Sequence, residues 1–322
     1  MESKIKIGIS LFSLTPLYVS RKMSFEDCLK AAHDMGFEGV EIVAAQMVPE
    51  YPNPSDEWLE YCKEQITKHQ LKLVTWSAYV DMGIRSDRDL TTEEIVQYTR
   101  NDLIYAKKVG AEIVRTQHAI TPEIFRKMLP FCKELDIKLT IEMHSPHHPD
   151  VPVWKEYLDI MAEPETEGYL GVVPDFSIFQ YTPHKLAIDS YIAGGCRHEK
   201  LKQIINDHNE GLSAEEIIAG GDYSDDEIKS VHDIKHRFNA PAKVDDFRKL
   251  LPYAPYIHGK FHYLTEECSD PTIPYEELLK MMVEFGYEGY IACEFEGHSF
   301  EEDPRIQLKR FVTMVNRILK KF

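Results

Sequence analysis

The stretch Lys138-Leu-Thr-Ile-Glu-Met-His144 is a short apolar run that ends in a carboxylate and an imidazole. A run of this length and composition predicts a buried β-strand. Side chains alternate between the two faces of a strand, so Glu142 and His144 point the same way, with His144 one step further along. A buried carboxylate is costly unless it is paired or bound to a metal ion. The stretch therefore predicts a strand with a polar site at its carboxyl end.

Similar β-rich runs recur along the chain, and each is followed by a helical pattern. The predicted strands are Ile5 to Ser10, Gly39 to Val43, Lys72 to Ala78, Glu112 to His118, Lys138 to His144, Leu170 to Phe176, Tyr256 to Tyr263 and Tyr290 to Phe295. Alternating strands and helices predict a parallel sheet, and eight strands predict a single (β/α)₈ TIM barrel over residues 1–322. The segment Ser24 to Met35 shows helix signals, with a serine N-cap and Gly36 as the stop, and Gly110 and Gly286 end two further helices.

One connection breaks this alternation. The segment from His184 to Val244, between the sixth and seventh predicted strands, is polar and rich in charge. It contains two helix-like segments, Leu201 to His208 and Ala214 to Ala219. Insertions on the βα loops of a barrel lie above its active face, and the apolar residues Leu201, Ile204 and Ile205 need burial. The insertion is therefore predicted to act as a lid or as a subunit interface.

Composition and charge limit the classes of partner. The 322 residues are 43% hydrophobic and carry a net charge of −17. This charge disfavours nucleic acid and anionic membranes, which bind through basic side chains. The start of the chain carries charge inside its first apolar run, unlike a signal peptide, and no apolar run approaches the ~18 residues of a membrane span. The six cysteines are scattered without a C-x-x-C pair, so we expect reduced thiols in a cytoplasmic protein.

Polar residues stand at the ends of four consecutive predicted strands, where the catalytic groups of a parallel barrel gather. The four ends are Ile141-Glu142-Met143-His144, Val173-Pro174-Asp175, Ile257-His258-Gly259-Lys260 and Ala292-Cys293-Glu294. Three carboxylates and an imidazole at a buried mouth need a shared cation. Oxygen ligands with one nitrogen and no sulfur suit Mn²⁺, Mg²⁺, Co²⁺ or a related divalent ion better than a structural zinc site. Any one of these residues alone is better explained as a hydrogen-bonded polar group at a strand end, so the inference depends on their common register.

This order of residues resembles the metal site of the xylose-isomerase-like barrels, a superfamily of sugar isomerases, ketose 3-epimerases, inosose dehydratases and endonuclease IV. The resemblance covers nearly the whole chain, and the metal ligands it implies are Glu142, Asp175, His258 and Glu294. In the ketose 3-epimerases a substrate-binding histidine follows the aspartate by three positions, whereas this chain has Ile178. A plain ketose epimerase is therefore disfavoured. The endonuclease branch implies further zinc ligands and a basic surface, which the net charge of −17 contradicts.

Three segments near the carboxyl end resemble a bacterial branch that acts on oxidised glycosides, the larger subunit of C-glycoside deglycosylase. They are Tyr256-Ile-His-Gly-Lys-Phe261, Ile273-Pro-Tyr-Glu-Glu-Leu-Leu279 and Gly286-Tyr-Glu-Gly-Tyr-Ile-Ala-Cys-Glu-Phe-Glu-Gly-His298. The resemblance implies cleavage of the carbon–carbon bond between an aromatic aglycone and a sugar oxidised at C3. It also implies Mn²⁺, a smaller partner subunit and an oligomeric complex.

On this interpretation His144 is the general base that removes the C2 proton beside the 3-oxo group, while the metal ion stabilises the enolate. A role for His144 as a metal ligand, or as a partner of a ligand, stays open. Lys260 and His262 share the parity of His258, so either can face the mouth and bind the enolate or protonate the leaving aglycone. The ligand on the seventh strand can accordingly be His258 or His262.

Further residues near the predicted strand ends are candidate substrate contacts. The candidates are His118, Trp76, Glu296 and His298, with Tyr79 and Phe12 as additional aromatic platforms. The alternative for the aromatic residues is an ordinary core position, which is the commoner one in barrels. Arg115 lies inside the fourth predicted strand and either contacts substrate or makes an internal ion pair.

Two other functions compete with a metal-dependent lyase acting on 3-oxo-C-glycosides. One is a metal-dependent isomerase or 3-epimerase of a free or phosphorylated sugar, which would need no partner. The other is a non-catalytic barrel subunit, which would not need the four-residue metal set. If the smaller partner subunit exists, the chain alone is expected to be weakly active or poorly soluble.

Overall fold

Eight parallel strands form the centre of the molecule in a computed structural model that describes residues 4–117, 119–238, 241–298 and 303–322. They are β1 (Lys6–Ser10), β2 (Gly39–Val43), β3 (Lys72–Ser77), β4 (Ile113–Thr116), β5 (Lys138–Met143), β6 (Leu170–Pro174), β7 (Tyr256–Phe261) and β8 (Tyr290–Phe295). Their order in the sheet is β6-β5-β4-β3-β2-β1-β8-β7. A bridge between Asp175 and His258 closes the ring between β6 and β7. The predicted TIM barrel is confirmed, and every observed strand lies within its predicted range.

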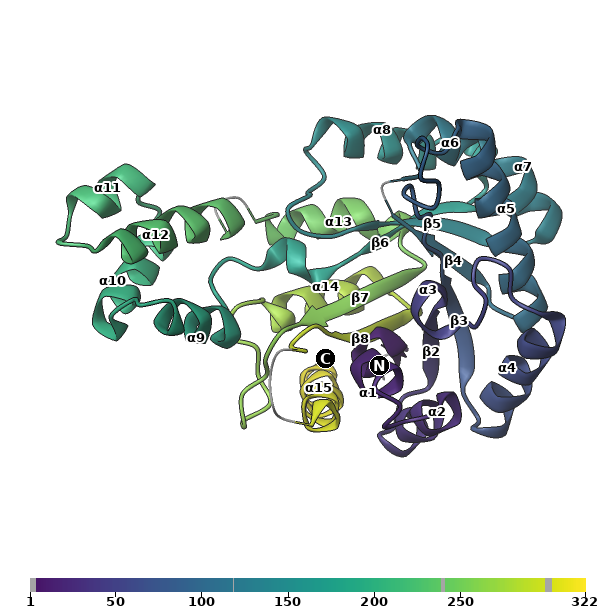
Figure 1. Cartoon of the computed structure of the whole chain (residues 1–322), viewed down its shortest axis with the longest axis horizontal. Coiled ribbons are helices and arrows are strands. Elements are labelled where there is room, and N and C mark those ends of the chain that lie inside the picture. Colours follow the sequence, from purple (N-terminus) through teal and green to yellow (C-terminus); the bar gives the residue numbers. More distant parts are fainter. Residues whose placement is uncertain (1–3, 118, 239–240, 299–302) are drawn as a thin grey trace.

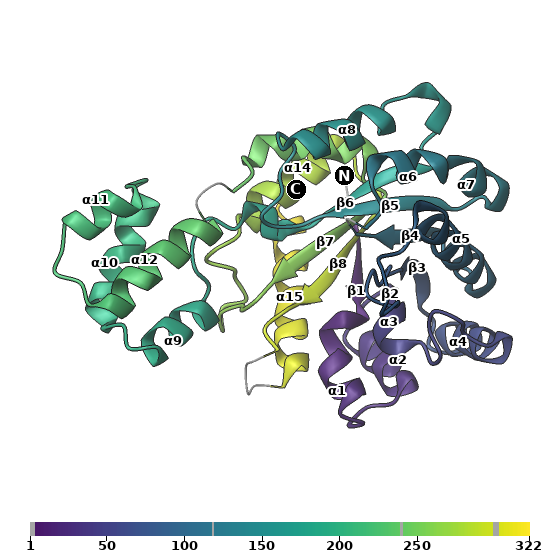
Figure 2. The same ribbon diagram turned by 45° about the horizontal axis from the view of Figure 1, so that its top comes forward.

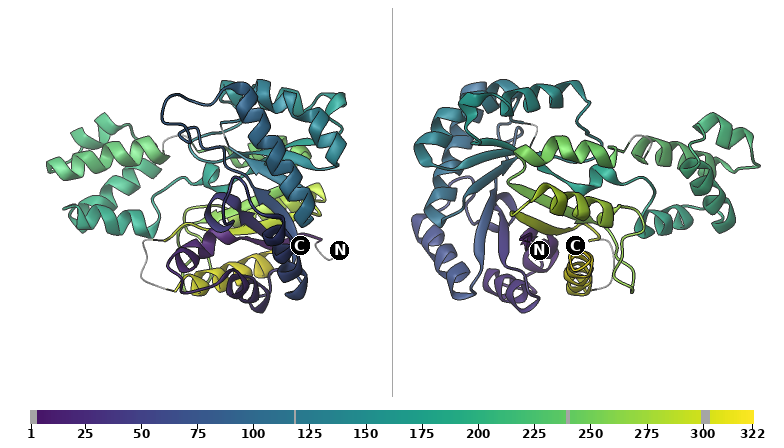
Figure 3. Two further views of the ribbon diagram at one scale, coloured as in Figure 1. Left: turned by 45° about the vertical axis from the view of Figure 1, so that its right-hand side comes forward. Right: turned by 180° about the vertical axis from the view of Figure 1, so that it is seen from behind.

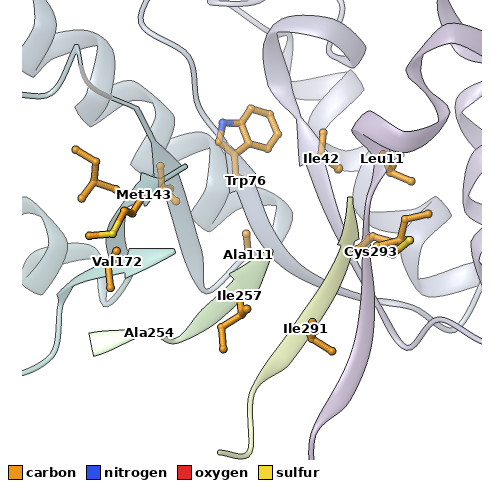
Figure 4. Packing of buried hydrophobic residues seen from close by; sticks show 14 of the residues in the cluster. Leu11, Ile42, Trp76, Ala111, Met143, Val172, Ala254, Ile257, Ile291 and Cys293 are labelled. Carbon is orange, nitrogen blue, oxygen red and sulfur yellow. The ribbon is translucent and has the colours of Figure 1, made fainter. Parts of the chain in front are cut away.

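Helices surround this barrel on its outer side (Figure 1). They are α1 (Thr15–Val19), α2 (Phe25–Asp34), α3 (Ala44–Met47), α4 (Asp56–Lys68), α5 (Thr92–Val109), α6 (Pro122–Lys127), α7 (Leu129–Leu135), α8 (Pro152–Met161), α13 (Phe247–Leu250), α14 (Tyr275–Phe285) and α15 (Pro304–Leu319). Short 3₁₀ turns cover Leu11–Leu14, Pro164–Thr166, Phe176–Phe179, Val244–Asp246 and Leu251–Tyr253. The large hydrophobic core lies in and around the strands (Figure 4).

Local sequence signals explain where these elements begin and end. The side chain of Ser24 accepts a hydrogen bond from the backbone of Asp27, and Asp27 in turn accepts one from the backbone of Ser24, which completes a capping box at the start of α2. Gly110 and Gly286 follow α5 and α14 in the left-handed region, with φ of +87° and +76°, which a glycine adopts without strain. In β5 every residue after Lys138 is buried, as expected for a strand covered on both faces.

The segment between β6 and β7 forms a separate helical insertion. Its helices are α9 (Lys185–Ala193), α10 (His198–Asn209), α11 (Ala214–Ala219) and α12 (Asp225–Phe238). They stand away from the barrel on the side toward which β7 points (Figures 1 and 2), and the two views of Figure 3 show the same separation. The segments predicted at 201–208 and 214–219 are helices α10 and α11, whereas α9 and α12 were not predicted.

The insertion has a hydrophobic core of its own. The buried residues in it are Cys196, Leu201, Ile204, Ile217, Val231, Ile234 and Phe238. Ile205 packs against this cluster, and the ion pair between Arg197 and Glu227 joins the start of α10 to α12 at 2.7 Å. The expectation that a lid closure or another subunit must bury Leu201 and Ile204 is therefore corrected, because the four helices bury both residues among themselves.

Two further observations concern the chain as a whole. Within the residues that the structure describes, no helix combines the length and the apolar character that crossing a membrane requires. All six cysteines are free thiols, and Cys268 alone among them is partly exposed.

Candidate active site

Four strand ends bring Glu142, Asp175, His258 and Glu294 together at the carboxyl end of the barrel. Each residue offers a ligand atom, these atoms all lie within 4.8 Å of one another, and all four residues are buried. We call these four residues the metal group. The parallel register explains the convergence, because Glu142, in β5, lies opposite Val173, two residues before Asp175, while Lys260, two residues after His258, lies opposite Glu294 in β8.

The chemistry of the metal group fits a divalent cation. His258 Nδ1 lies 2.9 Å from Glu142 Oε1 and 3.1 Å from Glu294 Oε2. Asp175 Oδ2 is buried and has no hydrogen-bond partner, although buried polar atoms are normally satisfied. A cation among these oxygens would satisfy this atom and balance the clustered negative charge. The metal group could therefore hold a divalent ion, with His258 as its single nitrogen ligand.

Glu41, a residue of β2 that the sequence analysis did not single out, determines how His258 is oriented. Glu41 is fully buried, and its Oε2 lies 2.7 Å from His258 Nε2. The carboxylate accepts the Nε2 proton, so that Nδ1, the nitrogen facing the metal group, is the one that would offer a lone pair to a metal ion once it loses its own proton. The available signal was a carboxylate in the middle of the apolar run Gly39-Val-Glu-Ile-Val43.

Arg115 makes the internal ion pair that was one of its two predicted roles. Its guanidinium lies 2.5 Å from Glu142 Oε2 and 3.3 Å from Glu41 Oε1, and it also lines the cavity above the metal group. Although burial opposes ionisation of Glu142, Arg115 and His258 hold the pKa of its carboxyl well below the usual value. Arg115 thus holds the Glu142 carboxylate in its charged form.

Protons and a cation compete for the negative charge of the metal group. Burial raises the pKa of Asp175 to about 7, and repulsion from Glu294 and Glu142 adds to the shift. Burial lowers the pKa of His258, but the carboxylates of Glu294 and Glu41 outweigh it and raise that pKa well above the usual value. Binding of a metal ion through Nδ1 requires loss of this proton, so metal binding and proton release are coupled.

A cavity of about 650 Å³ lies above the metal group, and we call it the main cavity. Glu142 and Glu294 line it, together with His144, Lys260, His262 and Glu296 among the predicted site residues. The insertion contributes His184 before α9 and the end of α12, where His236, Arg237 and Phe238 line the opening. One wall of the main cavity therefore comes from the insertion, although most of the insertion lies away from it.

His144 follows β5 and lines the main cavity without joining the metal group. Its Nδ1 lies 2.7 Å from the backbone oxygen of Ser145. A carbonyl oxygen only accepts, so Nδ1 carries the proton and Nε2 is the basic nitrogen of the neutral ring. This tautomer is the one that a general base acting through Nε2 requires.

Lys260 and His262 differ in charge although they share a strand face. Lys260 Nζ lies 2.8 Å from Glu296 Oε2 and 3.5 Å from Asp175 Oδ2. Burial opposes its charge, but these carboxylates raise the pKa of Lys260 well above the usual value. Burial and the neighbouring Lys260 lower the pKa of His262 to about 4. Lys260 is therefore a cation and His262 a neutral imidazole near pH 7.

His262 lies outside the metal group. Its ring stacks on His184 with 4.0 Å between centroids and an interplanar angle of 4°. Its Nε2 is 3.6 Å from Glu296. Of the two candidates, His258 in β7 and His262 directly after it, the geometry thus brings His258 to the other three residues of the metal group.

The remaining predicted substrate contacts occupy different places. Glu296, Phe12 and Tyr79 line the main cavity. Trp76 is fully buried, and its Nε1 donates to Asp102 Oδ1 at 2.8 Å. Figure 4 shows its ring among core side chains, so its position supports a core role rather than a substrate contact. His298 lies against Phe12, with 4.8 Å between ring centroids, and lines a separate cavity. His118 lies outside the described residues.

Residues 29–312 match the family described as xylose isomerase-like TIM barrel. The 3′-dehydrocarminate deglycosidase alpha subunit of Microbacterium sp. is 30% identical over 91% of this chain and 88% of its own length. A C-glycoside deglycosidase alpha subunit of Arthrobacter globiformis is 24% identical over 99% of this chain and 93% of its own length. A xylose isomerase-like TIM barrel protein of Mycobacterium smegmatis, solved in complex with magnesium, is 13% identical with a TM-score of 0.56, covering 99% of this chain and 98% of its own.

The fold is a TIM barrel with four buried residues that could hold a metal ion, and the chain belongs to the xylose isomerase-like TIM barrel family. Within that family it is related to the C-glycoside deglycosidase alpha subunits. The likeness to the solved structure, at 13% identity, shows the fold alone.

Proposed function

We propose that this protein is a metal-dependent lyase that cleaves the carbon–carbon bond between the sugar and the aromatic aglycone of a 3-oxo-C-glycoside. The observation that carries the proposal is the similarity to the 3′-dehydrocarminate deglycosidase alpha subunit at 30% identity over 91% of the chain. The buried metal group under a cavity of about 650 Å³ supports it, because the site combines a cation position with room for a glycoside.

The residues around the main cavity have different roles in the proposed reaction. A divalent ion held by Glu142, Asp175, His258 and Glu294, Mn²⁺ in our proposal, would act as a Lewis acid on the 3-oxo oxygen of the substrate. His144 takes the proton from C2 through Nε2, while the backbone oxygen of Ser145 holds the Nδ1 proton in place. The 3-oxo group makes the C2 proton acidic, which allows an imidazole to remove it.

The bond changes balance without an external oxidant or reductant. The electron pair of the C2–H bond forms the enolate and then the C1=C2 double bond as the C3 carbonyl returns. The C1–aglycone bond breaks, and its electron pair leaves on the aglycone carbon. That carbon takes up a proton, which we assign to Lys260, the buried cation beside Glu296 at 2.8 Å. The products are an unsaturated 3-oxo sugar and the free aromatic aglycone.

We further propose that the active form contains a smaller partner subunit. The relatives at 30% and 24% identity are named alpha subunits, which supports this part of the proposal. Co-expression of this chain with a smaller, separately encoded partner protein should raise soluble yield and turnover above those of the chain alone. A chain that is fully active by itself, with a mass in solution that corresponds only to copies of itself, would remove the partner from the proposal.

The test of the proposed reaction is release of the free aglycone. Purified protein, loaded with Mn²⁺, is incubated with a C-glucosyl flavone oxidised at C3 of the sugar, and the products are separated by chromatography with ultraviolet detection. The same glycoside without the oxidation is the control, because its C2 proton is not acidic and it should stay intact. Interconversion of free or phosphorylated ketoses, without any aglycone release, would replace the lyase by the isomerase or epimerase alternative. Absence of both reactions from metal-loaded complex would favour a non-catalytic subunit.

A further inference from the structure

A second cavity of about 370 Å³ adjoins the main cavity and shares Ala45 and Tyr79 with it. We call it the aromatic annex. It is lined by Ala45, Tyr51, Pro52, Tyr79, Val80, Asp81, Ile84, Leu90 and Tyr98. These residues come from the segments that follow β2 and β3 and from helix α5. The annex therefore extends the main cavity away from the insertion and over the opposite part of the barrel mouth.

The lining of the annex suits a flat and weakly polar molecule. Three of its residues are tyrosines, and all others except Asp81 are aliphatic or proline. The Asp81 carboxylate accepts a hydrogen bond from the backbone N–H of Gly83 at 2.8 Å, so part of its hydrogen-bonding capacity is used within its own loop. Tyr79 is 50% exposed and Ile84 is 43% exposed, and aromatic and aliphatic faces of this kind gain free energy when a ligand covers them.

Asp102, a buried carboxylate that takes no part in the proposed chemistry, holds residues of the annex in position. The hydroxyl of Tyr51 lies 3.0 Å from Asp102 Oδ2 and 3.2 Å from the backbone nitrogen of Tyr79. Trp76 donates to the other oxygen of Asp102 at 2.8 Å. These contacts hold the Tyr51 ring and the backbone at Tyr79 in place before any ligand arrives, which lowers the entropy cost of binding.

The opposite wall of the main cavity is charged. There Lys260 pairs with Glu296 at 2.8 Å, and His236 and Arg237 line the opening. Placing an apolar ring against these groups would desolvate them without replacing their hydrogen bonds. The sugar hydroxyls suit this wall, and the aromatic part of a substrate suits the annex.

We propose that the aromatic annex binds the aglycone of the substrate while the sugar lies over the metal group. This inference rests on the proposed function for the identity of the ligand, since it places the aromatic half of the glycoside. The annex thereby selects substrates with a flat aromatic aglycone, and its lining residues are specificity residues that do not contact the reacting atoms.

Direct binding of a free aglycone tests the annex without any turnover. The probe is 4′,5,7-trihydroxyflavone, measured by equilibrium dialysis with the metal-loaded protein. Ile84→Glu places a charge on an already exposed side chain, and Tyr98→Ser removes one ring. Each should weaken binding of the flavone by about tenfold, the value of one aromatic or apolar contact. Tyr61→Ser is the matched control, because Tyr61 is partly exposed on α4 and lines neither cavity, and it should bind the flavone as the unaltered protein does.

Kinetics with two 3-oxo-glucosides separates this inference from the proposed function. With the flavone C-glycoside, Ile84→Glu should raise KM about tenfold and leave kcat nearly unchanged, whereas with the methyl O-glucoside, which releases methanol by the same elimination, it should change neither constant. If all variants turn over the flavone glycoside with the same KM, the annex does not bind the aglycone, although the proposed lyase activity is retained. If the annex variants lose flavone binding in a protein that cleaves no 3-oxo-glycoside, the annex binds the aglycone but the proposed lyase activity is wrong. Equal flavone binding by all variants would also overturn the annex.

Discussion

The metal group and the helical insertion α9–α12 are held together in opposite ways. The metal group consists of charged, buried side chains from four strands, and one bridge that closes the barrel joins two of its members, Asp175 and His258. The insertion consists of consecutive helices around their own apolar cluster. The metal group therefore depends on closure of the whole barrel, whereas the insertion depends mainly on contacts within itself. Loss of a residue should accordingly have different effects in the two regions.

The largest effect is expected from removing a ligand charge. Glu142→Gln or Glu294→Gln should lower Mn²⁺ affinity by more than the roughly 10–100-fold that is typical of losing an outer partner, and should abolish turnover. Metal content after dialysis, measured by mass spectrometry, checks this. Glu296→Gln is the matched control on the same strand face, because Glu296 lies outside the metal group, and it should keep the metal. Full metal occupancy in both ligand variants would show that the metal group is not the binding site.

His144→Gln separates chemistry from metal binding within the same region. Removal of a general base should lower kcat by on the order of 10²-fold or more, with metal content unchanged because His144 lies outside the metal group. Single-turnover rates and metal analysis of one preparation provide both values. Near-normal turnover with metal retained would exclude His144 from the reaction, and loss of the metal would make His144 a ligand or a partner of one.

Glu41→Gln tests how far the metal group depends on a residue from across the barrel. The glutamine keeps an acceptor near His258 Nε2 but removes the charge, so Mn²⁺ affinity should fall by roughly 10–100-fold. Titration calorimetry and the electron paramagnetic resonance spectrum of bound Mn²⁺ would report affinity and ligand geometry separately. Glu38→Gln is the control, because Glu38 is exposed just before β2, and it should bind Mn²⁺ normally. Unchanged affinity and spectrum for Glu41→Gln would limit Glu41 to a structural role.

The smallest effect on the metal group is expected from a change in the insertion. Ile204 and Ile257 are both fully buried, the first in α10 and the second beside His258 in β7. Replacement of either by alanine should cost about 2–5 kcal/mol of local stability. Limited proteolysis should show Ile204→Ala opening the insertion while metal content stays unchanged, whereas Ile257→Ala should reduce metal content. Equal loss of metal in both variants would mean that the two regions fold as one unit.

The sequence by itself was sufficient to predict the barrel and the three carboxylates of the metal group. Each strand is a short buried run, and the alternation of side chains along a strand is a local rule that a sequence displays. A carboxylate in such a run stands out because burial of a charge is costly. Glu142, Asp175 and Glu294 were recognisable for this reason, and the shared parallel register placed them at one end of the barrel, whereas the choice between His258 and His262 stayed open.

Only the tertiary structure decided which residues meet from distant parts of the chain. Glu41 and His258 are 217 residues apart, and nothing local to either residue indicates the other. The same holds for Arg115, whose ion pair with Glu142 was one of two open alternatives, and for Trp76, which Asp102 holds in the core. The insertion shows most clearly where prediction from sequence ends. The apolar face of α10 was evident in the sequence, but the sequence did not show that the other helices of the insertion cover it. An amphipathic pattern shows that one face of a helix must be buried, and only the packing in the structure shows which residues cover that face.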